Sequence, residues 1–240
     1  MNIALLQIEL DASSPAGNLQ RVLAAIARVA KADPPPDLLV LPGACDTGGT
    51  TPRRDFPVSI IQNIREAIAF KAREWGIYIA VGLHTRGPDG YNHSAVLLDP
   101  DADAAAVHEV AGGSEGDGFA NARWCGIVGD IEVRALEGEA DTLVLEQVPS
   151  RGLLVAVPLP AGANVKPLAT GAHWAIVRSA GPAKGRGKMA SLLTRFVGPD
   201  GKEGRSAKSP KEEVVWTNIA LRPATSQERA DELLTAREID

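Results

Sequence analysis

The feature that most constrains the fold is the alternation of short apolar runs with amphipathic segments along the 240-residue chain. Residues 3–8 form a β-prone run, and the apolar residues of 19–29 recur at helical spacing. A buried apolar run follows at 38–41, then a second helical pattern at 61–75 and another β-prone run at 77–81. Strands that alternate with helices are typical of sheets covered by helices. The pattern therefore predicts an α/β fold.

The remaining segments extend this pattern. We expect 94–98 to pair with 77–81 across a loop at 87–90, and a short strand near Val107. Further strands are expected at 124–128, 142–145, 153–157, 174–178, 192–197 and 214–221, and helices at 131–136, around 167–172 and from Ser226. No repeat or linker divides the chain. We predict one domain over residues 1–240, whose tail, 221–240, is helical.

Charge and composition exclude several classes of protein. The formal net charge is −5, from 25 basic and 30 acidic residues, so no global positive field favours nucleic acid or an anionic membrane. No run of about 18 apolar residues occurs. Cys45 and Cys125 lie far apart and form no Cys-x-x-Cys motif, which favours a reducing cytoplasm over a disulfide scaffold. We expect a cytoplasmic protein without a cofactor, a nucleic-acid partner or a membrane anchor.

Several motifs follow one another in a recognisable order. They are Ile3–Gln7, Asp37–Pro42, Gly76–Gly82, Tyr91–Ala95, Gly126–Asp130, Glu139–Leu143 and the turn at 199–201. In this order and spacing the chain resembles the nitrilase, or carbon-nitrogen hydrolase, superfamily over nearly its whole length. The resemblance implies an αββα sandwich that pairs sheet to sheet into a homodimer. It also implies cleavage of nitriles or amides by a cysteine nucleophile, a glutamate base and a lysine that stabilises the oxyanion.

The three positions that the resemblance assigns to this triad carry other residues. Gly43 follows Leu41-Pro42, where the glutamate is expected, and Val128 stands two residues before Asp130, where the cysteine is expected. The lysine is expected near residues 109–110, where the chain has Glu109, and no lysine occurs between Arg73 and Val165. Glycine accepts no proton and valine has no nucleophilic atom. The sequence therefore predicts that the covalent mechanism of the superfamily is lost.

Other residues could have taken over these roles. Cys45 lies two residues beyond Gly43 and is the better candidate for a relocated thiol, although it could also be an apolar filler or a thiol facing solvent. Glu109, Glu115 and Asp130 are the acidic residues that could be recruited. Cys125 lies three positions before Val128 on one expected strand, and this odd spacing puts it on the opposite face, in the core.

The histidines give no metal-binding pattern. His84 and His93 flank the expected central hairpin, His108 lies near the lost lysine and His173 is expected to end a helix. No two of them have the His-x-x-x-His spacing of a helical zinc site. We therefore expect no metal.

A basic, glycine-rich run at 184–188 does not fit the phosphate-binding P-loop pattern, because Met189 follows Lys188. It is either a solvated loop or a weak anion site built from Lys184, Arg186 and Lys188. The residues expected to line a ligand site are Gly43, Cys45, Val128, Asp130 and Lys188.

Two hypotheses of function follow. The first is a nitrilase-fold protein without the hydrolytic triad, which acts as a small-molecule-binding, regulatory or scaffold protein. The second is an amide or nitrile hydrolase that uses a relocated catalytic group. The substituted positions, Gly43 and Val128, favour the first.

Overall fold

A computed structural model describes residues 1–48, 52, 55–87, 90–101, 106–110, 122–126, 129–133, 143–144, 154–159, 165–166, 172–180 and 193–220. Within these residues the fold is mixed α/β, with two six-stranded sheets and two helices. The α/β class predicted from the sequence is confirmed. Neither described helix is both long enough and apolar enough to span a membrane.

The first sheet has the strand order β14-β1-β2-β3-β4-β5. Its strands are β1 (Asn2–Gln7), β2 (Leu38–Val40), β3 (Tyr78–Arg86), β4 (Tyr91–Leu98), β5 (Ala106–Val110) and β14 (Glu213–Asn218). β1, β2 and β3 are parallel, whereas β14, β4 and β5 join by antiparallel pairing. Strands from opposite ends of the described chain, β1 and β14, therefore lie side by side.

The second sheet has the order β13-β12-β11-β9-β7-β6. Its strands are β6 (Ala122–Gly126), β7 (Gly129–Val133), β9 (Leu154–Pro158), β11 (His173–Val177), β12 (Arg195–Val197) and β13 (Glu203–Ser206). Two short strands, β8 (Leu143–Val144) and β10 (Val165–Lys166), form a separate parallel pair.

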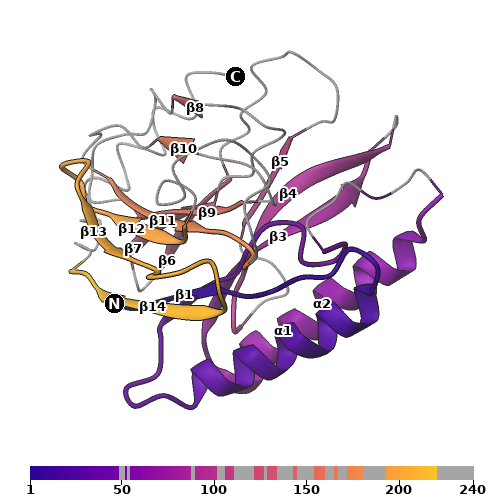
Figure 1. Cartoon of the computed structure of the whole chain (residues 1–240), viewed down its shortest axis with the longest axis horizontal. Coiled ribbons are helices and arrows are strands. Elements are labelled where there is room, and N and C mark those ends of the chain that lie inside the picture. The colour runs from indigo at the N-terminus through magenta and orange to yellow at the C-terminus, as the bar shows by residue number, and fades with distance from the viewer. Residues whose placement is uncertain are drawn as a thin grey trace.

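Helices α1 (Pro15–Ala30) and α2 (Val58–Trp75) lie side by side across the outer face of the first sheet, as Figure 1 shows. Each helix turns an apolar stripe toward that sheet, since buried residues recur along it at helical spacing. α1 begins where Pro15 follows Ser14, and α2 ends at Gly76, whose φ of 63° is the left-handed cap conformation that glycine adopts without strain.

Two apolar cores hold these layers together. One lies between the helices and the first sheet and includes Ile26, Ile68 and Val81. The other lies between the two sheets and includes Leu5 and Val177. The second core combines residues 3–97 with residues 131–219, so the described parts of both halves of the chain share it.

Most expected elements are present, and two expectations are wrong. The hairpin, the strand near Val107 and the turn at 199–201 are confirmed. The helix expected at 131–136 is wrong over 131–133, because Ile131 and Val133 alternate with Glu132 and form β7. His173 does not end a helix but opens β11, where its ring stacks on Phe196 with centroids 5.5 Å apart.

Sequence patterning also missed β13, whose residues are mostly exposed and carry no apolar alternation. The helix expected around 167–172 lies on residues outside the described ranges except Ala172, which directly precedes β11 and is not helical. The helix expected from Ser226 and the helical tail 221–240 lie entirely outside them.

Candidate functional site

The loop that follows β2 carries Gly43, at the position where the resemblance expects a general base. The loop runs beside β3, because the amide of Cys45 donates to the Gly82 carbonyl at 3.0 Å and the amide of Gly82 donates to the Pro42 carbonyl at 3.1 Å. The amide of Gly43 donates to the Leu159 carbonyl, beyond β9 of the facing sheet, at 2.9 Å. Gly43 is buried where both sheets meet the loop.

Gly82 explains how closely this loop approaches the sheet. A Cβ atom on Gly82 would lie 2.4 Å from the Gly43 Cα and 3.1 Å from the Pro158 Cβ. Only glycine at position 82 leaves room for this contact. Ala44 next to it has a φ of 53°, which is unusual for a residue with a side chain, so the backbone of the loop is held in a strained turn.

Cys45 is part of the core between the helices and the first sheet and is 1% exposed. Its thiol donates to the Pro42 carbonyl at 3.2 Å. Burial, and to a smaller degree the adjacent charge of Asp46, raises the pKa of the Cys45 thiol. A raised pKa keeps the sulfur as an uncharged thiol, which is a poor nucleophile. Of the roles considered for Cys45, this environment fits the apolar filler.

Asp46 and His84 form a fully buried pair beside Cys45. One carboxylate oxygen of Asp46 accepts the backbone amide of His84 at 2.8 Å, and the other lies 2.9 Å from His84 Nδ1. Both side chains are 0% exposed. Within the described part of the chain, His84 Nε2 has no hydrogen-bond partner. Asp46 thus fixes both the backbone and the ring of His84.

His93 lies opposite His84 in the antiparallel β3–β4 pair, with ring centroids 4.5 Å apart. Burial, followed by the charge of His84, lowers the pKa of His93 to about 4, against the opposing effect of Asp46. His93 is therefore uncharged at neutral pH. The two histidines form a cross-strand pair within the hairpin rather than flanking it.

Sequence reasoning did not find the Asp46–His84 pair. The two residues are 38 positions apart, and neither belongs to a motif of the superfamily triad. A polar residue immediately after Cys45, in a loop that follows a buried strand, was the one available signal. It becomes informative only when the β2 loop is known to run along β3.

Two of the other predicted site residues, Glu109 and Asp130, lie on described strands, and the rest lie outside the described ranges. Glu109 is on β5 opposite Ser94, and Asp130 is on β7 opposite Cys125. β5 contacts both β6 and β7 of the facing sheet, which brings the strands of Glu109 and Asp130 together. Val128, Glu115 and Lys188 lie outside the described ranges.

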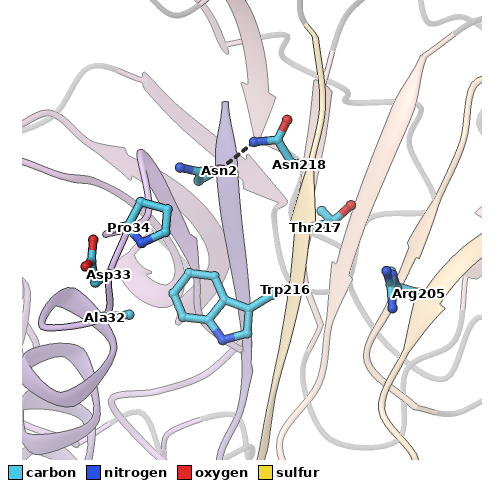
Figure 2. A pocket seen from close by; sticks show the side chains of 8 residues that line it. All are labelled: Asn2, Ala32, Asp33, Pro34, Arg205, Trp216, Thr217 and Asn218. Carbon is cyan, nitrogen blue, oxygen red and sulfur yellow. Dashed lines mark hydrogen bonds between the residues drawn. The ribbon is translucent and has the colours of Figure 1, made fainter.

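A groove of about 710 Å³ lies elsewhere in the molecule, beside Asn2 and Trp216 (Figure 2). Asn2 opens β1 and Trp216 is on β14, so the groove is at the beginning of the parallel strands. Gly43 follows the end of β2, at the opposite end of those strands. The groove contains none of the residues predicted as a site.

Comparison with known protein families matches part of the chain. The carbon-nitrogen hydrolase family model matches residues 2–109, from β1 to Glu109 of β5. No curated protein matches the sequence.

Solved structures resemble the chain over almost its full length. The amidase from Nesterenkonia sp. AN1 has a TM-score of 0.65 at 18% identity and covers 100% of both chains. A cysteine-to-alanine mutant of that amidase in complex with butyramide has a TM-score of 0.65 at 19% identity, with coverage of 98% of this chain and 96% of that chain.

A glutamate-to-glutamine mutant of the same amidase carries the acetamide moiety of fluoroacetamide on its active-site cysteine. It has a TM-score of 0.66 at 18% identity and covers 98% of this chain and 96% of that chain. The amidase is described as a member of the nitrilase superfamily. The chain therefore has the fold of nitrilase-superfamily amidases.

Proposed function

We propose that this chain is a nitrilase-fold protein that has lost the hydrolytic triad and acts as a small-molecule-binding, regulatory or scaffold protein. Gly43 is the observation that carries the proposal. It occupies the expected general-base position without a side chain, and its backbone is in contact with Gly82 and bonded to Leu159. Without a side chain, Gly43 offers no group that could accept a proton.

The other two triad positions support the same proposal from the sequence. Val128 stands where the nucleophile is expected and Glu109 where the lysine is expected. A carboxylate near a developing oxyanion would disfavour its charge, whereas a lysine would stabilise it. Loss of a nucleophile alone typically reduces the rate by orders of magnitude.

The alternative function is an amide or nitrile hydrolase with a relocated catalytic group, and one observation favours it. A histidine oriented by a buried carboxylate is a recurrent general-base arrangement in hydrolases, and Asp46 orients His84 in this way. Cys45 would be the nearest thiol, and Glu109, Glu115 or Asp130 the acidic groups. Against it, the Cys45 thiol donates to Pro42 and its pKa is raised.

A turnover assay separates the two functions. Ammonia release is measured with the full chain and butyramide, acrylamide, aliphatic nitriles and ureas, and fluoroacetamide adducts at Cys45 and Cys125 are sought by mass spectrometry. We expect ammonia release equal to a protein-free blank and no adduct. Release that Cys45→Ala abolishes and Cys125→Ala retains would establish the relocated mechanism. Loss of that release in His84→Ala, with a changed pH profile, would assign the base.

Assembly and location complete the proposal. We propose a cytoplasmic homodimer built from one domain per chain, with no nucleic-acid or membrane partner, because uncovered apolar sheet faces promote association. Size-exclusion chromatography with light scattering tests the dimer. A monomer at micromolar concentration would contradict it.

A further inference from the structure

The groove beside Trp216 is independent of the site around Gly43. It lies between the loop that follows α1, which supplies Asp33, and the edge strand β14 of the first sheet. Its volume of about 710 Å³ falls within the range of about 300–1,000 Å³ that is typical of small-molecule sites. No triad position and no residue of the Asp46–His84 pair lines it.

Trp216 supplies an accessible aromatic surface in this groove. Successive residues of β14 point to opposite faces, so Val215 enters the core between the sheets and Trp216 faces the other way. Trp216 is 39% exposed, whereas Trp174 on β11 is fully buried. An exposed indole in a concave site provides apolar and cation–π contacts for a ligand.

Opposite charges flank this indole. Figure 2 shows Trp216 between Asp33, Ala32 and Pro34 on one side and Arg205 on the other. Asp33 and Arg205 are exposed, and among the described residues neither forms an ion pair or a side-chain hydrogen bond. Neighbouring surface charges do pair, as Lys202 does with Asp200 at 3.2 Å.

Two amides line the groove between β1 and β14. Asn2 and Asn218 are register partners, and the side-chain amide of Asn218 donates to the side-chain carbonyl of Asn2. This bond fixes the orientation of both side chains. The groove therefore combines one aromatic ring, one free cation, one free anion and two oriented amides, as counted over the described residues.

We propose that this groove binds a small zwitterion whose ammonium and carboxylate are separated by a short apolar chain. The carboxylate of Asp33 accepts hydrogen bonds from the ammonium of the ligand, and the guanidinium of Arg205 donates hydrogen bonds to its carboxylate. The apolar chain of the ligand lies on the Trp216 ring. A ligand with only one charge leaves the other protein charge unpaired. The groove therefore discriminates zwitterions from simple cations and anions of the same length.

Isothermal titration calorimetry of the full chain with 6-aminohexanoate tests the proposal. Hexanoate and hexylamine are the matched probes, because each keeps the apolar chain and one of the two charges. We expect 6-aminohexanoate to bind at least about tenfold more tightly than either. Equal affinity for the three probes, or no heat from 6-aminohexanoate at millimolar concentration, would overturn it.

Variants assign the binding to this groove. Asp33→Asn, Arg205→Gln and Trp216→Ala are each expected to weaken 6-aminohexanoate binding by about tenfold or more. Asp200→Asn and Lys202→Gln remove the same charges from a neighbouring exposed pair and should leave affinity unchanged. Circular dichroism confirms that each variant is folded. Wild-type affinity in all three groove variants would overturn the assignment, whatever the turnover assay shows.

Discussion

The polar side chains at the two ends of the parallel strands β1 and β2 differ in burial. At the end where β2 leads into Gly43, Asp46 and His84 are fully buried and bonded to each other. At the end where β1 begins, Asp33 and Arg205 are exposed and have no ionic partner among the described residues. Among the described residues, the polar groups are buried at the end with the expected chemistry, which we call the closed end, and exposed at the other, which we call the open end.

This difference follows from the cost of burial. A carboxylate removed from water must find partners within the protein, and Asp46 finds two on His84. An exposed charge is already solvated by water, so Asp33 and Arg205 need no partner within the protein. Polar groups at the closed end therefore stabilise the loop, whereas those at the open end remain available to a ligand.

The largest expected effect contrasts Asp46 with Asp33. Asp46→Ala leaves the amide and the ring nitrogen of His84 buried without their acceptor, so we expect the free energy of unfolding to fall by about 2–4 kcal/mol. Asp33→Ala should change it by less than about 0.5 kcal/mol. Urea unfolding of both variants measures the contrast. Equal effects would mean that the two ends do not differ energetically.

A pH titration sharpens the contrast at the closed end. The pKa of His93 is lowered from 6.5 to about 4 in the folded chain. Between pH 4 and pH 6.5, His93 is therefore mostly protonated in the unfolded chain and mostly unprotonated in the folded chain. The stability that this group contributes is present above pH 6.5 and is lost as the pH falls toward 4, a loss on the order of 3 kcal/mol.

Urea unfolding at several pH values measures this slope, with His93→Gln as the control that lacks the titrating group. The wild type should lose more stability than the variant on acidification. Parallel curves for the two proteins would contradict the lowered pKa.

The packing of the β2 loop gives a smaller effect. Gly82→Ala places a Cβ 2.4 Å from the Gly43 Cα, and we expect a loss of about 1–3 kcal/mol in the free energy of unfolding. Gly204→Ala is the matched control, since its added Cβ would lie 3.7 Å from Phe196, an ordinary contact. Thermal unfolding compares them. An unchanged melting temperature in Gly82→Ala would show that the loop can move away from β3.

The smallest effect is expected in the groove. Trp216→Phe keeps an aromatic ring at a partly exposed position, so the free energy of unfolding should change by less than about 0.5 kcal/mol. Chemical unfolding monitored by circular dichroism measures it. A fall in the free energy of unfolding well above 1 kcal/mol would mean that the indole packs as part of the folded structure and is not available to bind a ligand.

Sequence periodicity predicted the parts of the fold that bury a regular apolar pattern. The stripes of α1 and α2 and the β3–β4 hairpin are of this kind. The segment 131–133 was assigned to a helix because three residues of apolar–polar alternation are too few to identify a strand. Only the facing sheet, which buries Ile131 and Val133 completely, distinguishes a strand from a helix at this point.

The residues at the expected triad positions, Gly43, Val128 and Glu109, could be proposed from the sequence, because the motifs around them are local. Their surroundings could not. The contact between Gly82 and Gly43, and the bonds from Asp46 to His84, join residues 38 or 39 positions apart that meet only when the β2 loop folds along β3. The groove likewise depends on β1, β14 and the loop after α1, which no sequence window contains together.

The pairing of β1 with β14 has a consequence for the order in which the chain folds. The strand β1 (Asn2–Gln7) is bonded along one edge to β14, which is synthesised more than 200 residues later. Until Glu213–Asn218 has been synthesised, that edge exposes unpaired backbone groups beside the apolar residues Ile3 to Leu6. Contacts of such long sequence separation close slowly. The first sheet is therefore completed late. Until then β1 is an unpaired edge strand, through which incompletely synthesised chains can associate with one another.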